Sequence, residues 1–190
     1  MYLAAAGCPR RGVSGPSSEV LTLFSVGERV MHPGQGLCTI VGFRDTPSPA
    51  LILEAGSGRN ATRLLYPADQ AEAHLHPPVS RAEALDVIEN YDSIACDTHT
   101  DRNSGQEEAY FKALLKRGVP DSVRVVKTMR TRIAQCERSA RKPSAYIARV
   151  LKEARLRSLE ELACALDTTP DVVEQMFRDR GAGIADDSAQ

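Results

Sequence analysis

The chain has 190 residues, of which 42% are hydrophobic and 26% charged, and its formal net charge is −1 at pH 7. This length suits one domain or two small ones, and no run of about 18 apolar residues occurs, which argues against a bilayer-spanning helix. The five cysteines are scattered, with no CxxC pair and no Cys/His cluster at zinc spacing. We therefore expect reduced thiols in a cytoplasmic protein and no metal or other cofactor.

The first 22 residues are rich in Gly, Ser and Pro. Their apolar part is short, and an Arg-Arg pair follows it instead of preceding it, which argues against a secretory signal peptide. We expect residues 1 to 22 to be a disordered leader or an over-extended start.

Residues 23 to 78 carry the pattern of short β-strands. In FSVGERVMHPGQGLCTIVGF, residues 24 to 43, apolar residues alternate on both sides of a His-Pro-Gly-Gln-Gly turn, which predicts a β-hairpin. Two more strands are predicted in ALILEAG and ATRLLYP, and Pro67 ends the last one because proline cannot donate to a ladder. Short strands with turns between them predict a small β-barrel, and Pro77-Pro78 marks its end.

From Ser80 the apolar period becomes helical. Ser80 and Glu83 have the spacing of a capping box. Further helices are predicted in AYFKALLKRG, in DSVRVVKTMRTRIAQCERSARK, from Ser144 to Ala165, and after Thr169-Pro170. The predicted fold class is therefore α+β, with a β-barrel over residues 23 to 78 and an all-α helical bundle over 79 to 181. A disordered tail is expected over 182 to 190.

A strongly basic segment lies within the predicted bundle. Residues 112 to 157 contain 14 Lys and Arg and three acids, a net charge of +11, which leaves −12 for the rest of the chain. This segregation favours a nucleic-acid partner over a merely solvated basic surface. The candidate phosphate contacts are Lys116, Arg117, Arg124, Lys127, Arg141 and Lys142. Binding through such contacts is expected to be weak, largely nonspecific and sensitive to salt.

No catalytic pattern is present in the sequence. The four histidines are spread over a strand, a boundary and a loop, and there is no nucleophile elbow, GxGxxG or P-loop. The Gly-rich GSGRN joins two predicted strands and opens no helix, so it is not a phosphate cradle. We expect a protein that is not an enzyme.

The hairpin sequence VGERVMHPGQGLCTIVGF resembles the CarD family of bacterial transcription regulators, whose N-terminal module is shared with the transcription-repair coupling factor. Val26-Gly27-Glu28, Val30-Met31, His32-Pro33 and Gln35-Gly36 match the family pattern in order. LLYPADQAEA resembles the family's strand ending in Val-Pro, and VLKEARLRSLEELACAL resembles its final helices. The resemblance covers residues 24 to about 167.

This resemblance implies a Tudor/SH3-like barrel that docks on the β subunit of RNA polymerase, by pairing a strand with a sheet edge. It also implies a helical domain that contacts promoter DNA at the upstream edge of the bubble and modulates open-complex stability. We expect a monomer beside polymerase. The two arginine places of the family fall at Thr46 and Leu65, with Arg44 and Arg63 two residues earlier. Since residues two apart share a strand face, Arg44 and Arg63 are the hypothetical polymerase contacts, with a solvated strand face as the alternative.

The tryptophan that wedges into the minor groove in the family has no counterpart, since the chain contains no Trp. Anchored on Tyr110, the Trp place falls at Gln106, and an Arg-Arg place falls at Glu108-Ala109. Either Tyr110 or Phe111 takes a reduced wedge role or the wedge is lost. We favour its loss; the alternative for both aromatics is packing in the bundle core.

Two further interpretations remain open. SLEELACALDTTPDVVEQMF has helix-turn-helix spacing, but Asp171, Glu174 and Asp179 suit a recognition helix poorly, so we favour packing of the last two helices. The other interpretation is an adaptor that binds proteins through both domains without DNA wedging.

Overall fold

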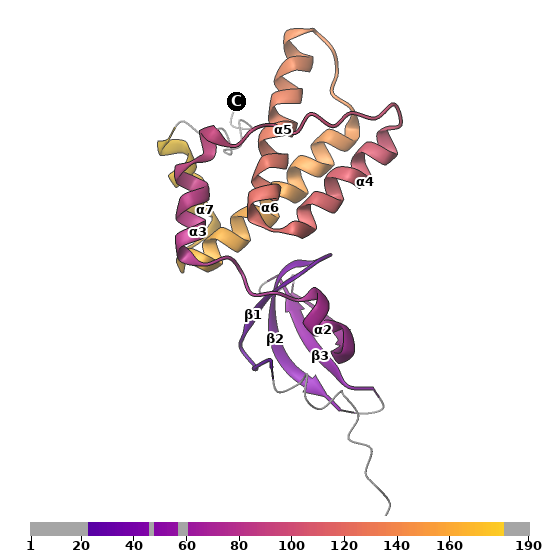
Figure 1. The fold of residues 1–190 in the computed structure, drawn as a ribbon, viewed down its shortest axis with the longest axis vertical. Coiled ribbons are helices and arrows are strands. Elements are labelled where there is room, and N and C mark those ends of the chain that lie inside the picture. The colour runs from indigo at the N-terminus through magenta and orange to yellow at the C-terminus, as the bar shows by residue number, and fades with distance from the viewer. Residues whose placement is uncertain (1–22, 46–47, 57–60, 181–190) are drawn as a thin grey trace, which may run out of the picture.

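The computed structural model describes residues 23–45, 48–56 and 61–180. Its strands are β1 (Arg29–His32), β2 (Gly36–Arg44), β3 (Ala50–Ala55) and β4 (Thr62–Pro67). Its helices are α2 (Ala68–His74), α3 (Arg81–Glu89), η2 (Tyr91–Ser93), α4 (Ser104–Leu114), η3 (Leu115–Arg117), α5 (Val119–Arg138), α6 (Ala145–Leu166) and α7 (Pro170–Asp179). The strands and α2 form one part of the molecule, and the helices from α3 onward form the other (Figure 1). The predicted leader and the predicted tail lie outside the described residues.

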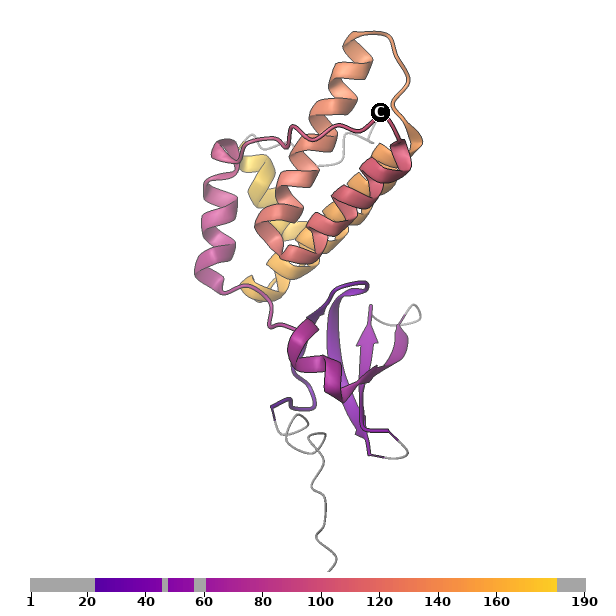
Figure 2. The same cartoon turned by 45° about the vertical axis from the view of Figure 1, so that its right-hand side comes forward.

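The strands form an open antiparallel sheet in the order β1-β2-β3-β4, so the predicted closed barrel is wrong. A barrel closes only where its first and last strands pair, and here four strands, the first of only four residues, leave β1 and β4 at opposite edges. Helix α2, which the sequence analysis did not expect, covers one face of the sheet instead (Figure 2). What remains of the prediction is an N-terminal sheet followed by helices.

The sheet has a small core of its own, on the face that α2 covers. Leu51 and Leu53 of β3 are fully buried there, together with Ile40 of β2. Ala68 and Ala71 of α2 pack against them, and their small side chains let the helix lie close to the sheet. This face corresponds to alternate positions of each strand, as the period of two requires.

The helical part has a second, larger core. Helices α5 and α6 run side by side, and α4 packs against both (Figures 1 and 2). Phe111 of α4 is fully buried between them, and Phe177 of α7 meets Tyr91 edge-on with ring centroids 5.6 Å apart. Val173 and Phe177 of α7 are buried in this core, so α7 packs on the bundle as the packing interpretation expects.

Several predicted helix boundaries are confirmed. Ser80 caps α3 through both bonds of the capping box, since the Glu83 N–H donates to Ser80 Oγ (3.3 Å) and the Ser80 N–H donates to Glu83 Oε2 (2.9 Å). Gly118 takes φ +125° between η3 and α5, a value that disfavours other residues. None of the helices in the described part of the chain is long and apolar enough to cross a membrane.

The two parts meet at the hairpin turn and the linker between α2 and α3. Arg157 of α6 donates from Nη1 to the Pro33 carbonyl oxygen (3.2 Å). The Met31 N–H of β1 donates to the His76 carbonyl oxygen of the linker (2.7 Å). The first contact joins the two parts directly and the second ties the linker to β1, so both help to hold the sheet against the end of the bundle.

Candidate partner-binding surfaces

The face of the sheet opposite α2 carries the predicted polymerase contacts. The register pairs Leu65 with Ile52 and Arg63 with Glu54, and it pairs Arg44 with Ala50. Since directly paired residues point to the same side of a sheet, Arg44, Arg63 and Leu65 share this outer face. The structure therefore places both arginines that the sequence analysis singled out on one face of the sheet.

Arg44 and Arg63 are exposed but stand apart. Their pairing partners on β3 are Ala50 and Glu54, which lie four positions apart and therefore about 13 Å apart along the strand. Arg44 is the last residue of β2. Thr46, the other position implied by the resemblance there, lies outside the described residues.

Arg63 forms a cross-strand ion pair. Its Nε donates to Glu54 Oε2 at 2.8 Å, while its side chain remains 70% exposed. An exposed pair of this kind contributes only about 0–1 kcal/mol to stability. Leu65, next on the same face, is a large apolar residue that is 50% exposed. A basic group beside exposed apolar surface suits an acidic and partly apolar partner.

The two edges of the sheet differ. β4 pairs only with β3 among the described residues, so its outer edge presents unpaired backbone groups. At the other edge, β1 forms an isolated antiparallel bridge between Met31 and His76. The edge available for strand addition is therefore that of β4.

Three arginines of the basic segment form ion pairs with acids that lie elsewhere in the sequence. Arg132 pairs with Glu107 (2.8 Å) and Arg149 with Glu108 (2.6 Å), both acids of α4. A third pair joins Arg155 to Glu174 of α7 at 2.6 Å. The net charge of +11 counted along residues 112 to 157 thus overstates the positive charge of the surface.

Two of the predicted phosphate contacts are already engaged within the fold. The Lys127 ammonium donates to the carbonyl oxygens of Tyr91 (3.0 Å) and Asp92 (2.9 Å) and lies over the Tyr91 ring. It therefore ties η2 to α5. Arg124 pairs with Asp121 one turn earlier at 3.0 Å. Both side chains remain partly exposed, but neither is a free cation.

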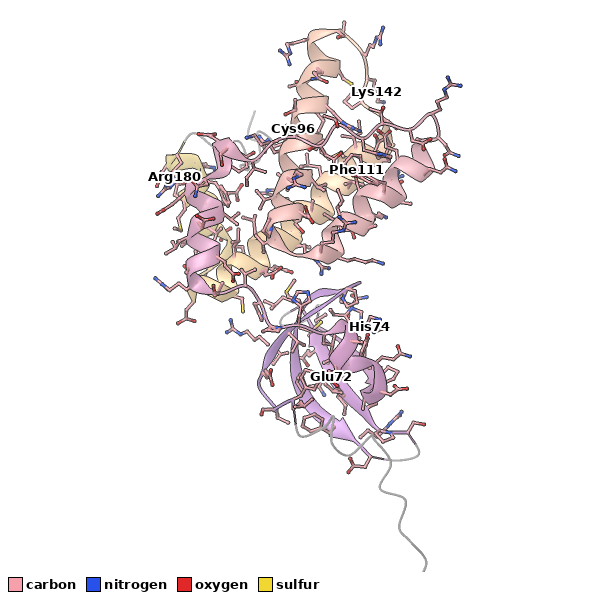
Figure 3. The ribbon with its side chains drawn as sticks, viewed as in Figure 1. Glu72, His74, Cys96, Phe111, Lys142 and Arg180 are labelled. Atoms are coloured by element: carbon pink, nitrogen blue, oxygen red, sulfur yellow. The ribbon has the colours of Figure 1, made fainter. Side chains whose placement is uncertain are left out.

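The other four predicted contacts are exposed and have no carboxylate within ion-pair distance in the described ranges; they are Lys116, Arg117, Arg141 and Lys142. Lys116 and Arg117 lie in η3, before α5, and Arg141 and Lys142 lie in the loop after it. Figure 3 shows Lys142 at the end of the bundle far from the sheet. The 20 residues of α5 separate the two basic ends by about 30 Å.

Neither candidate wedge aromatic projects freely. Phe111 is fully buried in the bundle (Figure 3). Tyr110 is partly exposed, but its ring stacks on His99 with centroids 3.7 Å apart and its hydroxyl donates to Asp97 Oδ2 (3.0 Å). Gln106, at the place of the Trp in the resemblance, is exposed in the first turn of α4. These placements agree with the favoured loss of strong wedging.

The sequence analysis missed a set of buried charges on α6. Arg157 is 7% exposed and Glu161 is 1% exposed, and each has side-chain atoms without a hydrogen-bond partner among the described residues. Burial lowers the pKa of the Arg157 guanidinium and raises the pKa of the Glu161 carboxyl. The sequence does contain a signal for this burial. Both residues follow Ala154 at helical spacing, so they lie on the otherwise apolar face of the helix.

In residues 23–45, 48–56 and 61–180, no three His, Cys, Asp or Glu side chains lie so that they could hold a metal ion. The comparisons with known proteins add no constraint, since no family model matches the chain and no curated protein matches it.

Proposed function

We propose that this protein is a transcription regulator that docks on the β subunit of RNA polymerase through β4 and the outer face of its sheet. The observation that carries the proposal is the free edge of β4 beside Arg63 and Leu65. An open edge allows a partner strand to add through main-chain hydrogen bonds, with flanking side chains giving specificity. A closed barrel would have no such edge, so the open sheet favours this docking mode.

In this proposal the helical part contacts promoter DNA through phosphates. The four exposed basic residues, at the two ends of α5, are the proposed contacts. Two basic clusters about 30 Å apart suit an extended polyanion that lies along the bundle. The resemblance to the CarD family supports an effect on open-complex stability.

The docking is tested by co-purification of the full chain with the isolated β-lobe of bacterial RNA polymerase. Arg63→Glu is expected to abolish capture of the chain by the β-lobe, because it replaces the base proposed to contact the β-lobe with an acid. The same change sets two acids opposite each other on β3 and β4, which weakens the sheet. The double variant Glu54→Arg/Arg63→Glu restores the cross-strand ion pair and separates these two effects.

Capture that stays lost in the double variant supports a direct contact of Arg63 with polymerase. Capture that returns shows that Arg63 only stabilises the sheet. Arg102→Glu, an exposed charge reversal in the loop before α4, is the matched control and is expected to bind normally. Failure of the unaltered chain to bind the β-lobe would remove the polymerase part of the proposal.

The DNA contact is tested by fluorescence anisotropy with duplex and forked DNA at several salt concentrations. Arg141→Gln/Lys142→Gln removes two phosphate contacts and is expected to reduce the slope of log K against log salt by about 1.8. Arg149→Gln, which removes an exposed cation already paired with Glu108, is the control and should change the slope little. Affinity that does not vary with salt contradicts the proposal.

A second candidate is an adaptor that binds proteins through both parts. The engaged Tyr110 and the buried Phe111 favour it, because neither of these two candidate aromatics is free to wedge between base pairs. If the protein is such an adaptor, the full chain binds the β-lobe but binds neither duplex nor forked DNA at low salt.

A further inference from the structure

A partly open cavity lies at the junction between the linker, α3, the start of α5 and α6, and among the residues of the proposed function only Arg117 lines it. Its volume is about 660 Å³, within the usual size of small-molecule sites. We call it the junction cavity. It includes His76 and Val79 of the linker and Glu161 of α6.

Glu161 is the unusual group in its wall. The side chain is 1% exposed, and it reaches the linker, where Oε1 accepts a hydrogen bond from the Val79 N–H (3.3 Å). Oε2 has no hydrogen-bond partner among the described residues. Burial raises the pKa of this carboxyl, while the Val79 N–H and the charges of His76 and Arg157 act in the opposite direction. A buried, half-satisfied carboxylate gains most from a donor that carries positive charge.

The other charged groups of the junction cavity extend this preference. Glu83 and Asp86 of α3 line it with Glu161, against Arg117 as the one Lys or Arg in its described wall. Three acids and one base give a local charge of −2, with histidine neutral. No three metal-ligand side chains lie close enough together to hold an ion in the described part of the chain. Glu83 and Asp86 lie one turn apart on α3, and Glu161 comes from α6.

Apolar surface separates these acids. Val79, Ala82, Val87 and Pro120 also line the junction cavity. Spread carboxylates with aliphatic surface between them suit a ligand that carries separated positive charges on a hydrocarbon chain. We propose that the junction cavity binds an aliphatic diamine or polyamine, with one ammonium group on Glu161 and another on Asp86. This inference goes beyond the proposed function and does not depend on it.

The test is isothermal titration of the full chain with 1,5-diaminopentane. Saturable binding with one ligand per chain is expected, and magnesium chloride at the same concentration should give no comparable heat. Glu161→Gln keeps the shape of the side chain and an acceptor for the Val79 N–H, and it is expected to raise Kd at least about tenfold. Glu153→Gln, on the same helix but outside the cavity lining, is the matched control and should leave Kd unchanged.

Two further variants keep the test decisive if Glu161→Gln folds poorly. Asp86→Asn changes an exposed acid of the cavity and should weaken diamine binding. Ala82→Trp fills the cavity without changing its charge and should abolish diamine binding. Absence of saturable binding, an equal response to magnesium, or unchanged affinity in Asp86→Asn and Ala82→Trp would overturn the inference.

Discussion

His32 at the end of β1 is expected to make the stability of the sheet depend on pH. Its Nδ1 accepts hydrogen bonds from the backbone N–H groups of Gly34 (3.0 Å) and Gln35 (2.9 Å), and its ring meets Tyr66 edge-on at 5.1 Å. Protonation puts a hydrogen on Nδ1 and removes both bonds. Burial, together with the charge of Arg157, lowers the pKa of His32 below its usual 6.5.

The sign of the effect follows from this lowered pKa. Above about pH 6.5 the imidazole is neutral in both the folded and the unfolded chain, so its contribution is fully present. As the pH falls below that value, the unfolded chain takes up a proton that the folded chain resists. The free energy of unfolding therefore decreases between pH 6.5 and the lower folded pKa of His32.

The magnitude can be worked from the contacts. Two donors share one Nδ1 lone pair, so the bonds together are worth about 1–2 kcal/mol, and the edge contact with Tyr66 adds about 0.5–1.5 kcal/mol. His32→Ala is expected to lose roughly 2–3 kcal/mol near pH 7.5, which lowers Tm by roughly 5–10 °C for a chain of this length. His32→Asn keeps an acceptor for the turn and should lose about 1 kcal/mol.

Thermal unfolding followed by circular dichroism near pH 7.5 and pH 5.5 checks both statements. The unaltered chain should lose more stability on acidification than His32→Asn, whose side chain does not titrate. Other titrating groups are common to both proteins and cancel in the comparison. An equal loss in the two proteins would refute the role assigned to Nδ1.

Three other outcomes are expected. Phe111→Ala should lower the free energy of unfolding by about 3–5 kcal/mol in thermal or denaturant unfolding, because a fully buried ring leaves a cavity; a loss below 1 kcal/mol would contradict its place in the core. Tyr146→Phe should cost about 1–3 kcal/mol in the same assay, since the Tyr146 hydroxyl donates to buried Glu107 Oε2 (2.6 Å), and burial together with this bond raises the pKa of Tyr146 to about 12; unchanged stability would count against it. Iodoacetamide at mildly alkaline pH should label Cys136 well before Cys38 in peptide mass spectrometry, because burial raises the pKa of the Cys38 thiol to about 11, and equal labelling would contradict this.

The helix boundaries could be predicted from the sequence because their signals are local. Ser80 and Glu83 lie three residues apart and bond to each other, and Pro170 begins α7 where a missing N–H costs nothing. The shared face of Arg63 and Leu65 could be predicted because strand parity needs only their spacing of two residues, whereas the pairing that puts Arg44 on that face comes from the structure.

The barrel depends on contacts distant in sequence, which explains why it was predicted wrongly. Whether a sheet closes is decided by where β1 and β4 lie relative to each other, and the α2 segment after Pro67 carries no strong helix-start signal. The ion pairs of the basic segment also could not be predicted, because Glu107, Glu108 and Glu174 lie outside residues 112 to 157 and meet its arginines only in the fold.

The unequal edges of the sheet also limit what the protein can assemble into. The bridge from Met31 to His76 occupies the edge of β1, which leaves β4 as the edge that can accept a strand. A chain with a single accepting edge takes one partner strand and then stops. Two copies joined through β4 would form a closed pair, and propagation into a fibre by sheet extension would require the linker to leave β1 first.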